Sequence, residues 1–156
     1  MIYFFILISN LFNFNTINEP SVIDYSNLYI AKSEIKPLQV QDSLLVKSME
    51  RGSTIYTDFC MQCHMENGSG VAGTFPPLAK ADFLNTNTVA SIRAVKYGIQ
   101  GKIVVNGTTY DSAMPSPGLY DYEVADVMNY VLNSWGNKAE GTITEDQVSE
   151  VQEKQN

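Results

Sequence analysis

Apolar side chains recur every three or four positions in three stretches of the chain, which is the spacing of one face of an α-helix. The first stretch ends at about Phe59, with Ser48 or Ser53 as its N-cap. The others cover about 89–97 and 121–134. The apolar stripes are Ile55, Tyr56 and Phe59; Val89, Ile92, Val95 and the stem of Lys96; and Val124, Val127, Met128, Val131 and Leu132. The pattern therefore predicts three amphipathic helices.

Shorter features fill the rest of the C-terminal half. Ile103-Val104-Val105 before Asn106-Gly107 predicts a short strand and a turn. Residues 137–156 form an acidic C-terminal extension that we expect to be a solvated appendage. Within it, Thr144 is placed to cap a short helix, from which Val148 and Val151 would touch the body of the protein.

The N-terminal third has a different character. Residues 1–15 are apolar enough for the hydrophobic region of a secretory signal, but too short and too interrupted by asparagine for a membrane span. No basic residue precedes the apolar run and no small-x-small cleavage site follows it. A cleaved signal peptide, a retained N-terminal anchor and a buried strand therefore all stay open. Residues 16–47 are polar, lack a period and are interpreted as a linker.

Length and charge limit the class of protein. A chain of 156 residues suits one domain with a core. The formal net charge of −7 argues against binding to nucleic acid or to an anionic membrane surface. We expect docking partners with basic or neutral faces.

The chemistry concentrates at Cys60-Met61-Gln62-Cys63-His64. Two cysteines separated by two residues and followed by histidine form the C-x-x-C-H pattern for covalent attachment of a c-type haem, with the histidine as proximal iron ligand. A structural zinc site needs four ligands, and the chain has only two cysteines and one histidine. A thioredoxin-like dithiol would need a βαβ pattern that does not follow. A plain disulfide stays open but leaves His64 unexplained.

A second axial ligand can be narrowed by elimination. Since His64 is the only histidine, bis-histidine ligation within one chain is excluded, and methionine is the other common partner. Of six methionines, Met1 lies in the leader, Met61 and Met65 flank the proximal ligand, and Met49 and Met128 have helical core spacing. Met114 remains, presented from a loop that Pro115 stiffens.

Other residues are candidates for supporting roles. The glycine-rich loop 66–73 lacks a Walker lysine, so we interpret its glycines as letting backbone pass close to the porphyrin. Phe75 and Leu78 would then cover a haem face. Arg93 and Lys96 are candidate partners for a haem propionate.

These features together resemble a class I monohaem cytochrome c over about residues 48–136. The matching features are Gly52 and Tyr56 before the haem motif, Pro76-Pro77-Leu78 after it, the segment from Asn106 to Tyr110 leading to Met114-Pro115, and the closing helix from Val124 to Trp135. The resemblance implies an all-α cytochrome c fold with about three to five helices around one covalently bound haem.

The resemblance also implies residue roles. The Pro76 carbonyl would accept a hydrogen bond from the His64 imidazole, Leu78 would pack on the haem, and Tyr110 would belong to the distal loop. Gly52 and Tyr56 would contact the last helix near Val127 and Tyr130. Tyr120 replaces the polar residue that usually opens that helix, so Asp121 is expected to be its cap.

An iron held by His64 and Met114 has no vacant position, which suits electron transfer between a donor and an acceptor protein of a respiratory or reductase chain. The alternatives are a haem subunit of a larger complex and a peroxidase-like enzyme with a labile distal ligand. Because bacterial haem attachment follows export, we expect a periplasmic protein, tethered to the membrane only if the N-terminal segment is retained.

Overall fold

The computed structural model describes residues 37–153, without the side chains of residues 37–40. The expected signal or anchor over residues 1–15 and most of the expected linker lie outside the described residues. Within 37–153, no helix is both long enough and apolar enough to cross a membrane.

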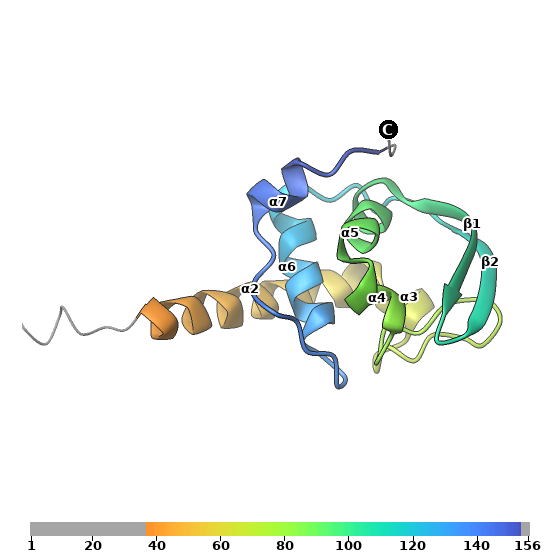
Figure 1. Cartoon of the computed structure of the whole chain (residues 1–156), viewed down its shortest axis with the longest axis horizontal. Helices are drawn as coiled ribbons and strands as arrows, with labels where there is room; N and C mark the ends of the chain where they lie inside the picture. The colour runs from red at the N-terminus through yellow and green to blue at the C-terminus, as the bar shows by residue number, and fades with distance from the viewer. Residues whose placement is uncertain (1–36, 154–156) are drawn as a thin grey trace, which may run out of the picture. The chain divides into compact units, whose positions relative to one another are not determined.

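Six helices and one β-hairpin make up this part of the chain (Figure 1). In chain order they are α2 (Pro37–Phe59), α3 (Met61–His64), α4 (Asp82–Thr86), α5 (Thr88–Tyr97), β1 (Ile99–Val105), β2 (Thr108–Met114), α6 (Asp121–Leu132) and α7 (Glu145–Ser149). The fold is mainly helical, as expected, with the hairpin as an addition.

Helix α2 is longer than the sequence predicted. It ends at Phe59 as expected, but it begins at Pro37 and not near Ser48 or Ser53. Proline is favoured at the first helical position, where its missing N–H has no intrahelical partner in any case. Ser48 is not a cap, because it is buried in the middle of the helix and donates to Asp126. The part of the expected linker from residue 37 onward is therefore helical.

Helix α6 crosses α2 and forms the centre of the core. Val124, Val127, Met128, Val131 and Leu132, all predicted to face inward, are each at most 5% exposed. The expected capping role of Asp121 is wrong. Tyr120 occupies the N-cap position, and its backbone N–H donates to the Glu123 carboxylate at 2.9 Å. Glu123 therefore supplies the reach-back bond of a capping box.

The hairpin extends the predicted strand and turn. Strands β1 and β2 pair antiparallel from Ile99 opposite Met114 to Val105 opposite Thr108. Asn106 and Gly107 both have positive φ, as a two-residue turn of this kind requires. Met114 is thus the last residue of a strand, and not part of the loop in which it was predicted.

The C-terminal extension packs on the body. Thr144 caps α7 as predicted, accepting from the Gln147 N–H at 3.2 Å. Val148 is fully buried and Val151 is 6% exposed, so both make the contacts that were expected of them. The expectation of a solvated appendage is wrong for this stretch, since α7 packs against α6.

Candidate cofactor site

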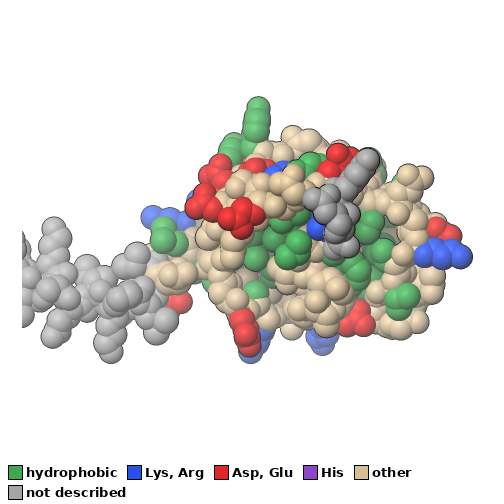
Figure 2. Space-filling model, turned by 45° about the horizontal axis from the view of Figure 1, so that its top comes forward, with side chains coloured by type: hydrophobic (Ala, Val, Ile, Leu, Met, Phe, Trp, Pro, Cys, Tyr) green, Lys and Arg blue, Asp and Glu red, His purple; other side chains and the backbone are tan. Residues whose placement is uncertain are grey.

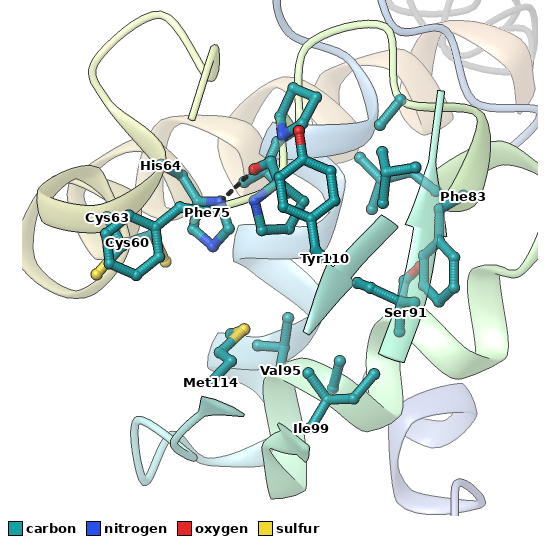
Figure 3. A pocket seen from close by; sticks show the side chains of 18 of the residues that line it. Cys60, Cys63, His64, Phe75, Phe83, Ser91, Val95, Ile99, Tyr110 and Met114 are labelled. Carbon is teal, nitrogen blue, oxygen red and sulfur yellow. Dashed lines mark hydrogen bonds between the residues drawn. The ribbon is translucent and has the colours of Figure 1, made fainter. Parts of the chain in front are cut away.

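One deep pocket lies between α3, α5, the hairpin and α6 (Figure 3). Its volume is about 1090 Å³, counting the space at its open mouth. Eight residues predicted to bind a cofactor all line it: Cys60, Cys63, His64, Phe75, Pro76, Leu78, Tyr110 and Met114. They come from three separate parts of the chain, and the fold brings them to one pocket.

Two cysteines and the histidine share one face of a helical turn. Residues at i, i+3 and i+4 point to the same side of a helix, and Cys60, Cys63 and His64 have this spacing. The turn is closed by backbone bonds from Cys63 N and His64 N to Cys60 O, at 3.1 and 2.9 Å. Both sulfur atoms and the imidazole therefore meet the pocket together, as the motif requires.

The imidazole of His64 is held in a defined orientation. Its Nδ1 lies 3.0 Å from the Pro76 carbonyl oxygen. Because a carbonyl can only accept, Nδ1 carries the proton and Nε2 is left with a free lone pair. Burial lowers the pKa of His64, an effect that the Pro76 bond partly opposes. The neutral form, which is the one that binds a metal ion, is thereby favoured.

The glycine-rich loop positions the Pro76 carbonyl. Gly70 has φ of +61°, and a Cβ there would lie 2.6 Å from the Pro76 oxygen. Gly68 has φ of +67°, and a Cβ there would overlap the Trp135 ring. Neither glycine lines the pocket. We predicted that these glycines let the backbone pass close to the porphyrin. In the structure they instead allow close packing against Trp135 and the backbone of residues 75–76.

An aromatic cluster supports the same loop from behind. Tyr56 packs on Tyr130 and on Trp135, with ring centroids 5.5 and 4.9 Å apart. Its hydroxyl donates to the Met65 carbonyl at 2.6 Å, directly after His64 in the chain. Burial raises the pKa of Tyr56, so the phenol stays a donor. Helix α2 therefore anchors the end of the C-x-x-C-H segment.

Met114 enters the pocket from the end of β2. Figure 3 shows it away from the α3 residues, with its sulfur among the pocket-lining side chains. The φ of the following Pro115 is fixed by its ring, and Met114 itself is paired with Ile99. Met128 also lines the pocket and is 1% exposed, so a second thioether is within the same wall.

Most of the lining was not foreseen from the sequence. Ile99, Ile103 and Val105 of β1 and Phe83 of α4 line the pocket, and Val104, which lies between Ile103 and Val105, is 55% exposed. The alternation of inward and outward side chains along β1 was the available indication.

Arg93 and Lys96 do not line the pocket, contrary to their predicted role with a propionate. Arg93 Nε donates to the Gln152 carbonyl at 2.8 Å. Lys96 Nζ donates to the Val148 carbonyl at 2.9 Å and forms an ion pair with Asp121 at 2.8 Å. Both cations bind residues that lie 25 or more positions further along the chain. Sequence spacing gives no indication of contacts across such separations.

The donor set of the pocket fits a covalently attached haem. Its wall offers two thiols, one oriented imidazole and a thioether, and is otherwise largely apolar. Burial, and then the neighbouring Cys63, raise the pKa of Cys60 to about 11. Among the described residues, no group of three or more histidine, cysteine, aspartate or glutamate side chains could hold a bare metal ion.

Comparison with known proteins agrees with this site. The profile of the family described as cytochrome c matches residues 49–135, and the chain belongs to that family. It is 40% identical over 91 residues to cytochrome c-552 of Thermus thermophilus, a match that covers 55% of this chain and 69% of that protein.

Other relatives are subunits of dehydrogenases. The cytochrome c subunit of the quinone alcohol dehydrogenase of Gluconacetobacter polyoxogenes is 35% identical over 106 residues, 65% of this chain and 22% of the subunit. The cytochrome c subunit of the gluconate 2-dehydrogenase of Pantoea cypripedii is 30% identical over 126 residues, 73% of this chain and 28% of the subunit. The chain thus spans less than a third of these relatives.

Membership of the family identifies the cofactor. Cytochromes c carry haem c covalently attached through C-x-x-C-H, which in this chain is Cys60, Cys63 and His64. Electron transfer in respiratory chains is the work of this family.

Proposed function

We propose that this chain is a one-electron carrier whose haem iron is bound by His64 and Met114. The observation that supports it is the convergence of an oriented imidazole and a strand-end thioether on one pocket, beside the two thiols. The group supplies a ferric–ferrous couple when bound. The protein would attach it through Cys60 and Cys63, bind its iron through His64 and Met114, and exclude water.

Each ligand has a distinct effect on the couple. His64 would bind the iron from Nε2, while the bond to the Pro76 carbonyl fixes the orientation of the ring and the position of its proton on Nδ1. A methionine thioether on the other side favours ferrous iron and raises the reduction potential. Phe75, Leu78 and Tyr110 lie on the pocket wall and would pack against the porphyrin. Their apolar bodies reduce water access to the metal, which tunes the potential further.

Saturation of the iron favours electron transfer over substrate chemistry. An iron bound by both His64 and Met114 would leave no position at which small molecules such as oxygen or peroxide could bind. We therefore propose a carrier and not a peroxidase-like enzyme, which would need a labile distal ligand.

The partners and the location are proposed on chemistry. Some relatives are cytochrome c subunits of dehydrogenases, so a dehydrogenase is a reasonable class of electron donor. The net charge of −7 favours docking to basic or neutral faces. We place the protein in the periplasm, because haem attachment by the bacterial route follows export, with a possible N-terminal tether.

Replacement of each pocket methionine tests the ligand assignment. We expect Met114→Ala to abolish the near-infrared sulfur-to-iron absorption band and to lower the reduction potential. The control is Met128→Leu, which removes the other thioether that lines the pocket but keeps a side chain of similar volume. This variant should leave the band intact. If Met128→Leu removes the band and Met114→Ala does not, the sixth ligand is Met128. Carbon monoxide binding distinguishes an enzyme, since a saturated iron binds it poorly.

A further inference from the structure

The loop after Met114 is tied to one residue at both of its ends. Ser116 Oγ donates to the backbone carbonyl of Lys96 at 2.7 Å. Five residues later, Asp121 at the start of α6 pairs with the ammonium of Lys96 at 2.8 Å. Both ends of the segment 115–120 are therefore bonded to one residue, Lys96, in the last turn of α5.

The backbone beside Lys96 also contacts the methionine strand. Gly98 has φ of +84°, and a Cβ there would lie 2.7 Å from the Met114 carbonyl and 2.9 Å from the Ser116 nitrogen. Ile99, the next residue, pairs with Met114 in the hairpin. The end of α5 thus lies directly against the main chain that carries the proposed distal ligand.

The C-terminal segment completes the surroundings of the Lys96 ammonium. Lys96 Nζ donates to the Val148 carbonyl at 2.9 Å, and it lies 5.4 Å from the centre of the Tyr97 ring. The Lys96 side chain is only 14% exposed, and Val148, whose carbonyl accepts its bond, is fully buried. A charge-assisted bond that is shielded from water is stronger and more directional than an exposed one.

We propose that Lys96 is a positioning residue for the distal methionine, which it holds by bridging both ends of the 115–120 loop, while the C-terminal segment orients its ammonium. Val148, outside the stretch that matches the cytochrome c family, thereby contributes to the haem site through Lys96. The inference rests on the proposed ligation by Met114. Lys96 would thereby affect how firmly the sulfur of Met114 stays bound to the iron.

The test uses the full-length holoprotein and two measurements of sulfur ligation. Lys96→Met keeps the aliphatic stem and removes the ammonium, so it breaks the bonds to Asp121 and Val148. We expect the near-infrared band to disappear at a lower temperature than in the natural protein, while the far-ultraviolet circular dichroism is still native. We also expect carbon monoxide to bind about tenfold more readily to the ferrous form, since one charge-assisted bond has about that effect on an equilibrium.

Matched controls separate positioning from general stability. Arg93→Gln breaks the bond to Gln152 in the same C-terminal segment, but among the described residues Arg93 forms no hydrogen bond or ion pair with the 115–120 loop. It should leave both measurements unchanged, and Lys96→Arg should restore most of the natural behaviour. Equal effects of Arg93→Gln and Lys96→Met would overturn the proposal, as would an unchanged band in Lys96→Met. If the natural protein itself lacks the band, the proposed ligation by Met114 is wrong. That result differs from the two outcomes that overturn only the role of Lys96.

Discussion

Gly52 of α2 lies against the backbone carbonyl of Asp126 in α6, so closely that a Cβ on Gly52 would overlap the carbonyl group. The same Cβ would be 2.9 Å from the Cβ of Tyr130. The two helices therefore approach backbone to backbone at this crossing. Because α2 leads into Cys60 and α6 lines the pocket, the crossing sets the distance between two walls of the haem site.

We predict that Gly52→Ala destabilises the protein by several kcal/mol, although the same change on an exposed helical surface stabilises by about 1 kcal/mol. The reason is that backbone atoms of α6 cannot move aside as a flexible side chain would. Chemical denaturation followed by circular dichroism measures the change. Lys47→Ala, on the exposed surface of the same helix, is the control and should have little effect. A stabilised Gly52→Ala would contradict the close crossing.

Asp126 is a buried carboxylate whose partners differ in exposure. It is 3% exposed and accepts from Ser48 Oγ and from both Arg51 Nε and Nη2, each at 2.6 Å. The Arg51 side chain is 60% exposed. Removing Arg51 leaves a charge without compensation inside the protein, whereas removing the charge of Asp126 leaves Arg51 in water.

We therefore predict that Arg51→Met costs about 3 kcal/mol of unfolding free energy and Asp126→Asn about 1 kcal/mol. The double variant should resemble Asp126→Asn alone, because Arg51 then has no carboxylate left to pair with. Urea denaturation of the four proteins gives the comparison. Equal costs for the two single variants would show that Asp126 gains solvent when Arg51 is lost.

Met114→His would replace the thioether with a second imidazole. We predict a low-spin protein without the near-infrared band and with a lower reduction potential, because imidazole stabilises ferrous iron less than thioether does. Potentiometric titration and visible spectroscopy measure both changes. A potential equal to that of the natural protein would mean that residue 114 is not bound to the iron.

The raised pKa of Lys96 predicts that the stability of the protein depends on pH. Burial alone would lower its pKa, but the hydrogen bond and charge of Asp121, together with Tyr97, raise the pKa above its ordinary value. A group with a raised folded pKa stabilises the protein fully below its unfolded pKa and loses that contribution as pH rises through the folded value. The natural protein should therefore be more stable than Lys96→Met up to about pH 10, with the difference shrinking above pH 10.5. A difference that grows with alkaline pH would contradict this.

The sequence predicted the elements whose residues follow a period. Helices α5 and α6, the Asn106-Gly107 turn and the Thr144 cap needed only local patterns and turn chemistry. The start of α2 was missed because residues 37–47 carry no clear stripe. Pro37 at the first helical position was the overlooked indication.

The site was predictable to the extent that covalent chemistry has a fixed spacing. The C-x-x-C-H motif and the elimination of other methionines led to residues that the structure brings to one pocket. Lys96 and Asp126 were not predictable, because their partners are far away in the chain and nothing in sequence spacing pairs them. The sequence around a lysine at the end of a helix is the same whether its ammonium faces solvent or binds a distant part of the chain.

Trp135 is the only tryptophan of the chain, and it packs on Tyr56 of α2 and against Gly68 of the loop after the haem motif. It follows that the single indole of the protein lies at the place where α2, this loop and the end of α6 meet. Opening of that junction can be followed by fluorescence without attaching any label.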